Sequence, residues 1–505
     1  MVKFNRLPAL ALFSLVSATS VAAQEDAGPR FMADVPANIQ TPDTVKTRIG
    51  ILEFSDGLPD QATVQKVYDN IDFSRGVEAF LSGMPAASVY ALCQGLEDVG
   101  AAKNKGIGVT ENLMDARSLF LTANTTTVYV FFCVDLADGP VVAQVPPGVL
   151  GPVDDAYFRY VTDVGLIGPD RGKGGKYLFV PPGYSGELPS EGYFVTKSPT
   201  NTNLVLYRAF VKDGDIAAAV TNVKDHARVY PLSTDKEPPD TTFINISGKQ
   251  FNTVHANDFH FYEELNSVIQ AEPGDAFDPE TVGLFASIGI KKGKPFAPDA
   301  RMKAILTEAV AVGNATARSM VFAPRDERAK FYPDRQWNNG FIGNSYQFLN
   351  DGARMLDART MFHYAATGIT PAMADAKPGT GSAYAFAVRD STGTYLDGSK
   401  AYKITLPFPV PAGQFWSFTV YDNQTRSMLE TDQKLAGIDS SQPGIKKNED
   451  GSVTVWFSPE APSGQEGNWV QTMPGKGWNS LLRLYAPLEP WFDKSWKPGD
   501  FERVD

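Results

Sequence analysis

The chain has 505 residues, of which 43% are hydrophobic and 11% aromatic, and its 46 basic and 58 acidic side chains give a formal net charge of −12. Because a negative surface repels phosphate backbones, nucleic-acid binding is disfavoured. The composition is that of a globular chain rich in turns, neither disordered nor fibrous, and its length favours two or more domains.

Residues 1–23 have the pattern of a cleavable secretory signal. Lys3 and Arg6 precede an apolar stretch at 7–16, and small residues follow at 21–23. The stretch is shorter than the roughly 20 apolar residues that a membrane-spanning helix needs. We therefore expect cleavage after residue 23 and a periplasmic or secreted protein. No later segment is expected to cross a membrane.

The first half of the mature chain changes from helical to strand patterns. Residues 24–50 are polar, contain prolines and show no sustained period, which predicts a mobile or strapped-down leader. Residues 51–123 are predicted to be a helical region, since apolar side chains recur at helical spacing from Asp60 to Glu97, where Gly83-Met84-Pro85 predicts a break between two or three helices. Residues 124–232 are predicted to form a first antiparallel β-domain. Its strands are expected at 126–134, 141–145, 156–162, 176–180, 192–196 and 204–210.

The second half repeats this alternation. A helix is expected at 214–229, and residues 233–350 are predicted to be a helical connector with helices at 257–270, 279–288 and 298–322. A further helix at 351–366 begins the second β-domain, residues 351–505. Its strands are expected at 383–388, 402–406, 415–421, 452–457 and 481–485. These patterns predict an α+β fold, dominated by two antiparallel β-sandwich domains that a helical connector joins.

The only two cysteines allow two interpretations. Cys93 and Cys133 could form a disulfide in an oxidising compartment, which would add roughly 3–4 kcal/mol in the chain-entropy model. Alternatively, both could be buried thiols, because Cys133 lies in an apolar strand and Cys93 follows a helix-like stretch. Their separation, without a CxxC motif, does not indicate a zinc site.

Common catalytic motifs are missing from the sequence. It contains no Gly-x-Ser-x-Gly, no His-Glu-x-x-His, no Walker loop and no Gly-x-Gly-x-x-Gly before a helix. Among its four histidines only His255 and His260 are close in sequence, and with Asp258 and Glu264 they could ligate an ion such as zinc. We favour the interpretation that these are polar residues at the start of a helix, with Asp258 as its cap, and we assign no metal ligand.

Two carboxylates and one polar segment are candidates for a site. Asp163 and Asp422 each end an apolar strand, where burial could raise the pKa and make an acid or base. Either could equally cap a turn. Asn124, Thr126 and Tyr129 could form a polar wall for a hydroxyl-bearing ligand, although an Asn at such a position often bonds the backbone.

Aromatic residues of the second β-domain form a further candidate surface. With one guanidinium they could bind sugar rings or planar acids, although aromatic strand residues are more often core. The candidates are Trp416, Tyr421, Trp469, Arg483 and Tyr485.

Short motifs in both halves resemble a bacterial exported family that combines domain of unknown function 1254 with domain of unknown function 1214. The amino-terminal motifs include Gly174-Gly175-Lys176-Tyr177 and Lys197-Ser198-Pro199-Thr200-Asn201, and the carboxyl-terminal ones Gln414-Phe415-Trp416-Ser417 and Leu482-Arg483-Leu484-Tyr485. The resemblance implies two jelly-roll-like β-domains joined by helices, and it names no catalytic residue. Ala123, Thr125 and Thr126 replace a Pro and an Asp usual in the family, so the amino-terminal site could be altered or idle.

The leading hypothesis is an exported enzyme that acts without a nucleotide cofactor, by hydrolysis or elimination, on a small or oligomeric, carbohydrate-like organic substrate. Asp163 or Asp422 would be the base, Arg483 the oxyanion partner and Tyr421 the donor, beside the binding residues Asn124, Thr126, Tyr129, Trp416, Trp469 and Tyr485. A non-catalytic periplasmic ligand-binding or envelope-associated protein is the alternative, and a metal enzyme using His255 and His260 a second one. The sequence leaves the cofactor and self-association open.

Overall fold

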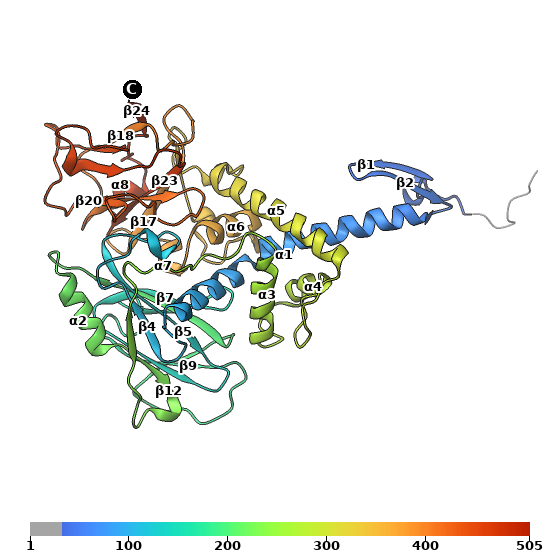
Figure 1. The fold of residues 1–505 in the computed structure, drawn as a ribbon, viewed down its shortest axis with the longest axis horizontal. Helices are drawn as coiled ribbons and strands as arrows, with labels where there is room; N and C mark the ends of the chain where they lie inside the picture. The colour runs from blue at the N-terminus through green and yellow to red at the C-terminus, as the bar shows by residue number, and fades with distance from the viewer. Residues whose placement is uncertain (1–32, 505) are drawn as a thin grey trace, which may run out of the picture. The chain divides into compact units, whose positions relative to one another are not determined.

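The computed structural model describes residues 33–504 in two compact units, Met1–Tyr68 and Asp69–Asp505 (Figure 1). Each unit is described separately. The predicted signal sequence at 1–23 lies outside the described residues.

The described part of the first unit contains a small antiparallel sheet of three strands. They are β1 (Thr44–Thr47), β2 (Gly50–Ser55) and β3 (Leu58–Pro59). Strand β1 and the first residue of β2 lie within the predicted leader, residues 24–50. A local turn joins the two strands, since the Thr47 hydroxyl donates to the Gly50 carbonyl at 2.8 Å and Gly50 has φ of +108°.

Helix α1 (Gln61–Asp98) is one continuous helix of 38 residues, so the predicted break at Gly83-Met84-Pro85 is wrong. Packing explains why a glycine stands there. A Cβ at Gly83 would lie 2.8 Å from Leu265 of α3 (His260–Ala271), so the missing side chain lets the two helices approach closely. A sequence pattern that signals a break can thus mark a helix crossing.

The apolarity of α1 differs from the expectation that no segment after the amino terminus could cross a membrane. By length and composition alone, α1 is long and apolar enough to do so. However, 72% of its apolar window is buried inside the protein, which is typical of a core helix. Phe80 and Met84, both fully buried, belong to the core that α1 shares with α3 and α5 (Ala300–Phe322).

Gly95 of α1 has the closest backbone neighbour on this helix and gives a first prediction. A Cβ at Gly95 would lie 2.1 Å from the Asn252 carbonyl oxygen. We expect Gly95→Ala to lower the free energy of unfolding by about 1–3 kcal/mol, because backbone must move. The control is Gly283→Ala in α4 (Pro279–Ser287), where nothing lies within 4 Å. Denaturant unfolding that finds both variants equally stable would contradict this account.

Two sheets form the first β-domain. The six-stranded sheet has the order β13-β4-β5-β11-β7-β8, and the four-stranded sheet the order β10-β9-β6-β12. Val130, Val205 and Tyr177 lie in the core between them. The strands are β4 (Gly106–Val109), β5 (Thr127–Asp135), β6 (Val141–Val145), β7 (Val149–Asp155), β8 (Tyr160–Gly165), β9 (Gly175–Val180), β10 (Phe194–Lys197), β11 (Thr202–Phe210), β12 (Arg228–Pro231) and β13 (Thr242–Asn245).

One predicted strand of this domain, at 156–162, is largely a turn between β7 and β8. The Asp155 carboxylate accepts hydrogen bonds from the backbone N–H of Tyr157 and Arg159, at 2.8 and 2.9 Å, and so closes the turn. The strand was predicted here because Tyr157, Phe158 and Tyr160 are aromatic, and aromatic residues are common in strands. Conversely, β7 was not predicted. Gly151 lies in this strand, where a Cβ would meet the Leu206 carbonyl.

The second β-domain also has two sheets, with the orders β14-β17-β23-β19-β20 and β22-β21-β18-β24. Phe418, Phe457, Trp478 and Phe501 form an aromatic cluster at its centre. The strands are β14 (Trp337–Asn338), β17 (Ser382–Ala387), β18 (Ala401–Leu406), β19 (Trp416–Asp422), β20 (Gly437–Asp439), β21 (Val453–Ser458), β22 (Trp469–Gln471), β23 (Trp478–Tyr485) and β24 (Glu502–Val504), beside the separate hairpin β15 (Leu349–Asn350) and β16 (Ala353–Arg354).

Helices connect the two β-domains, and aspartates cap the starts of three of them. The side chains of Asp215, Asp278 and Asp299 accept hydrogen bonds from the first turns of α2 (Ile216–His226), α4 and α5. The remaining helices are α6 (Leu356–Ala365), α7 (Pro371–Ala374) and α8 (Glu489–Phe492). The predicted α+β fold of two β-domains joined by helices is confirmed (Figure 1).

A disulfide joins Cys93 to Cys133, with Cα atoms 5.7 Å apart. It links α1 to β5, a central strand of the six-stranded sheet. Of the two interpretations of these cysteines, the structure therefore contains the disulfide.

Candidate functional site

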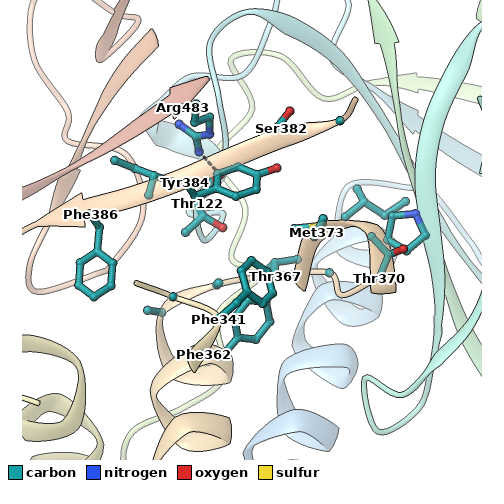
Figure 2. A pocket seen from close by; sticks show the side chains of 18 of the residues that line it. Thr122, Phe341, Phe362, Thr367, Thr370, Met373, Ser382, Tyr384, Phe386 and Arg483 are labelled. Atoms are coloured by element: carbon teal, nitrogen blue, oxygen red, sulfur yellow. Dashed lines mark hydrogen bonds between the residues drawn. The ribbon is translucent and has the colours of Figure 1, made fainter. Parts of the chain in front are cut away.

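A cavity of about 190 Å³ lies between the six-stranded sheet of the first β-domain and the five-stranded sheet of the second. Segments around α6 and α7 complete its wall. Figure 2 shows Arg483 and Tyr384 on one side of this cavity, and Phe341, Phe362 and Met373 on the other. Domain interfaces of this kind are common positions for ligand sites.

Strand register brings the polar residues to this cavity. On β11, Val205 and Tyr207 face the core of the first β-domain, whereas Leu204 and Leu206 belong to the core cluster shared with the second. Since side chains alternate along a strand, Arg208 points with Leu206 toward the second β-domain. On the opposite sheet, Tyr384 of β17 pairs with Arg483 of β23.

Arg483 is buried, with 2% of its surface exposed, and its two terminal nitrogens donate to protein groups. Its Nη2 donates to the Thr122 carbonyl and to the Tyr421 hydroxyl, both at 2.6 Å, and to the Ala123 carbonyl at 3.3 Å. Its Nη1 donates to the Thr419 hydroxyl at 2.8 Å. The Tyr421 hydroxyl in turn donates to the Ala123 carbonyl at 2.5 Å. Arg483 therefore ties the segment before β5 to the second β-domain.

Arg208 is half-buried and differs from Arg483 in having no such partners. No hydrogen bond or ion pair joins its guanidinium to another residue within 33–504. Its electrostatic neighbours are the phenols of Tyr384, Tyr129 and Tyr485 and the cation of Arg483. Because an arginine side chain stays charged, this is a positive group that faces the cavity uncompensated.

Tyr129 is the second polar residue of the cavity with a hydrogen-bonding group that is not used by the described residues. Its hydroxyl oxygen accepts from the Asn124 backbone N–H at 3.2 Å and from Asn124 Nδ2 at 3.0 Å. The hydroxyl proton has no acceptor among the described residues. Burial raises the pKa of Tyr129 to about 12, so the phenol stays protonated and can donate to a ligand.

The other walls are mostly apolar. Among the described residues that line the cavity there is no Asp, Glu, His, Lys or Cys, although Arg426 lines it together with Arg208 and Arg483. A cationic and apolar lining of this kind suits a ligand with one negative group and an apolar body.

The two predicted strand-end acids, Asp163 and Asp422, do not line this cavity. Asp163 accepts hydrogen bonds from the Thr370 hydroxyl at 2.7 Å and the Tyr160 hydroxyl at 3.0 Å, so that Thr370, and not the acid, lines the wall. Burial raises the pKa of Asp163, and these hydrogen bonds partly oppose the shift. Asp422 accepts from Lys476 Nζ at 2.8 Å and from the Gln424 N–H at 2.7 Å. Asp422 is thus a turn residue, and the structure brings neither acid to Arg483.

The predicted polar and aromatic surface is divided among several places. The Asn124 side-chain oxygen accepts from the backbone N–H of Thr126 and of Thr127, so Asn124 organises the entry to β5. The Thr126 hydroxyl lies 3.2 Å from the Tyr485 hydroxyl. Trp416 is buried in the core, and Trp469 donates from Nε1 to the Ser458 carbonyl at 3.0 Å. Only Tyr129, Tyr421 and Arg483 of the predicted residues line the cavity.

The two neighbouring histidines have different surroundings. His255 is buried with Nδ1 at 2.8 Å from the Ala256 carbonyl, whereas His260 is exposed and bonded to Asp258 at 2.9 Å. Across residues 33–504 no three His, Cys, Asp or Glu side chains are grouped so that they could hold a metal ion.

The residue that the sequence interpretation missed is Arg208. Its signal was present, because it is the one charged residue in the apolar strand Leu204-Val205-Leu206-Tyr207-Arg208-Ala209-Phe210. A charge in a strand that is otherwise buried needs a reason. Ser382 and Tyr384 of β17 carry no comparable signal, since hydroxyl and aromatic residues are common in strands.

Comparisons with known proteins agree with the predicted domain pair. Residues 106–231 match the family model for DUF1254, a protein of unknown function, and residues 381–489 match that for DUF1214, likewise of unknown function. No curated protein matches the chain. The crystal structure of the VPA0106 protein from Vibrio parahaemolyticus is similar with a TM-score of 0.53 and 18% identity, over 86% of this chain and 100% of that one. An uncharacterised protein from Burkholderia cenocepacia has a TM-score of 0.38 and 12% identity, over 87% and 96%.

Proposed function

Because the chain combines a DUF1254 domain with a DUF1214 domain, neither of which has an assigned chemistry, we propose a function from the cavity itself. The protein is an exported binding protein for a small organic anion with an apolar body, such as an aromatic or branched carboxylate. The observation that carries this proposal is Arg208, a cation without an acidic partner in a mostly apolar cavity.

Electrostatics favours an anion in this place. A charged group removed from water is costly unless an opposite charge and hydrogen bonds compensate it. A ligand carboxylate would supply both to Arg208, through two parallel N–H···O bonds. Tyr129 would donate a third bond from its free hydroxyl proton. The guanidinium of Arg483 adds positive potential, although its Nη1 and Nη2 already donate to protein groups.

The size and lining of the cavity favour a compact apolar body. Leu206, Phe341, Met361, Phe362 and Met373 line it. An apolar cavity of roughly 150 Å³ holds a benzene molecule in another protein. The volume of about 190 Å³ therefore suits a ligand the size of benzoate.

The lining supports binding better than turnover. Hydrolysis or elimination requires a group that accepts a proton within hydrogen-bonding distance of the substrate. The nearest predicted base, Asp163, is separated from the cavity by Thr370 and is already bonded to Thr370 and Tyr160. Catalysis by the predicted strand-end acids therefore has weaker support than binding without turnover.

Export is part of the same proposal. The disulfide between Cys93 and Cys133 supports it, because such bonds persist in oxidising compartments and are rare in the cytosol. The signal pattern at residues 1–23 points the same way.

Replacement of Arg208 tests the binding proposal. We expect Arg208→Met to weaken the binding of benzoate by about 30- to 100-fold, because the charge-assisted hydrogen bonds to the carboxylate are lost. Calorimetric titration of the purified protein would measure the change in Kd. The control is Lys212→Met, which removes the same formal charge from an exposed position just after β11.

Two results would count against the proposal. One is equal affinity of the wild type for benzoate and for uncharged benzamide, which would mean that the carboxylate is not recognised. The other is equal loss of affinity in Arg208→Met and Lys212→Met, which would assign the effect to net charge alone.

A further inference from the structure

Three arginines from separate elements lie near one another around Tyr157. Arg159 belongs to the turn between β7 and β8, Arg354 to β16 and Arg359 to α6. The Tyr157 phenol has these three guanidiniums and the Asp278 carboxylate as its charged neighbours. None of the three arginines lines the first cavity, so this arginine cluster is separate from the anion site proposed above.

Contacts with neighbouring side chains hold the arginine cluster in place. The Tyr157 hydroxyl donates to the Ser82 carbonyl of α1, and Arg359 Nη2 donates to the Ser82 hydroxyl at 3.3 Å. The rings of Tyr157 and Phe277 pack with their centroids 4.9 Å apart. The Arg159 guanidinium carbon lies 5.6 Å from the centroid of the same Phe277 ring. These shared contacts bring Arg159 and Arg359 to one place in the fold.

The positive charge of the arginine cluster is only partly compensated. Arg159 Nε donates to the Asp155 carboxylate at 2.6 Å, and this is the one ion pair that the three arginines make within residues 33–504. Asp278 is the other nearby acid, but its carboxylate already accepts from the backbone N–H and the hydroxyl of Thr281, at 2.9 and 2.7 Å. Three cations therefore face two acids, and both acids have local partners.

Hydrogen-bond donors of the arginine cluster remain accessible. Arg354 is exposed, and its guanidinium makes a single hydrogen bond to a described residue, from Nη1 to the Gln347 carbonyl. The side chain of Arg159 is 41% exposed. Neither Arg159 Nη1 nor Arg359 Nη1 donates to another residue in the described part of the chain, and neither atom is shielded from solvent. A ligand in solution can therefore reach these N–H groups.

Repulsion inside the arginine cluster also favours a bound anion. Partial burial and the neighbouring charges of Arg359 and Arg159 lower the pKa of Arg354. An anion placed between the guanidiniums would replace this repulsion with attraction.

The number of donors indicates which anion fits. A guanidinium presents its N–H groups in one plane, and two of them can bind two oxygens in parallel. A carboxylate has two oxygens and one charge, which a single arginine satisfies. A phosphate group has three acceptor oxygens and carries between one and two negative charges near neutral pH. We propose that the arginine cluster binds a phosphate group, either free in solution or on a lipid headgroup.

Arg354→Met tests this proposal, because Arg354 is exposed and its loss should leave the fold intact. The probe is inorganic phosphate, titrated against the full chain at low salt by phosphorus NMR. We expect Arg354→Met to weaken binding by about 5- to 10-fold, because hydrogen bonds to a charged group are lost. Arg354→Lys keeps the charge but not the planar donors, so it should weaken binding by a smaller factor.

Two controls keep the site apart from general charge effects and from the first cavity. Arg325→Met removes the same formal charge from a side chain that is 84% exposed and paired with Asp357, outside the arginine cluster. It should leave the Kd for phosphate unchanged. Arg208→Met should also leave this Kd unchanged, because Arg208 lines the first cavity.

A second measurement separates the two sources of the phosphate group. The full chain is sedimented with vesicles of phosphatidylcholine, with and without phosphatidic acid. Sedimentation that requires phosphatidic acid and is lost in Arg354→Met would assign the cluster to a lipid headgroup. Binding of inorganic phosphate without such sedimentation would assign it to a free phosphate.

Three results would contradict the proposal. One is a folded wild type that binds neither inorganic phosphate nor phosphatidic acid vesicles. Another is equal weakening in Arg354→Met and Arg325→Met, which would mean that only net charge matters. The third is unchanged binding in both Arg354→Met and Arg359→Met, which would place the phosphate elsewhere on the protein.

Discussion

Arg483→Met is expected to lower the free energy of unfolding by about 4 kcal/mol. Methionine cannot donate to the Thr122 carbonyl or the Thr419 hydroxyl, and each buried group left without its partner costs about 1–3 kcal/mol. The Tyr421 hydroxyl also loses its donor, although it keeps the Ala123 carbonyl as acceptor. Denaturant unfolding, monitored by tryptophan fluorescence and by circular dichroism, would measure the loss.

The control for this prediction is the same substitution at Arg208. That guanidinium has no hydrogen-bond partner among the described residues, and its burial is costly, so Arg208→Met should not lower the free energy of unfolding. The two variants should therefore separate stability from anion binding. If both variants lose the same free energy of unfolding, the hydrogen bonds of Arg483 do not contribute specifically to stability, and the roles assigned to the two arginines would be wrong.

Loss of the disulfide should have the second largest effect. We expect Cys93→Ala combined with Cys133→Ala to lower the free energy of unfolding by about 3–4 kcal/mol. The disulfide closes a loop with a sequence separation of 40, and without it the unfolded chain gains conformational freedom. The measurement is guanidinium unfolding under oxidising conditions.

A reductant provides the matched comparison. It should destabilise the wild type by a similar amount and leave the double alanine variant unchanged, because that variant has no sulfur to reduce. A wild type that is indifferent to strong reductant after full unfolding and refolding would contradict a structural role for the disulfide.

Strand positions were largely predictable because they depend on short-range patterns. Apolar runs between turn residues correctly indicated β6 at 141–145, and nearly the right limits for β11, β18 and β19. The errors arose where a local signal had a tertiary cause. Gly83 and Gly151 look like breaks in a helix and a strand, but each lacks a side chain because another element passes close by.

The candidate site was only partly predictable, for a related reason. Arg483 and Tyr421, predicted as oxyanion partner and donor, both line the cavity, yet the sequence does not tell that their polar atoms bind each other and the segment before β5. Asp163 and Asp422 were chosen because strand ends often carry functional acids, but both have local partners. Arg208 was not predicted as a site residue. Its distinguishing feature is that its guanidinium has no hydrogen-bond partner among the described residues, and this can be seen only in the three-dimensional structure.

By itself, the sequence determined the elements, their grouping into two β-domains with helices between them, and the pair of domains to which the chain is similar. Periodicity, turn residues and capping acids act over a few residues, so the secondary structure that they specify can be predicted from the sequence without knowledge of the fold. Tertiary structure alone decided which cysteine interpretation holds, which glycines mark crossings, and which arginine of the cavity lacks a hydrogen-bond partner among the described residues. Each of these depends on atoms far apart in the sequence, such as Thr122 and Arg483, whose meeting requires the whole fold.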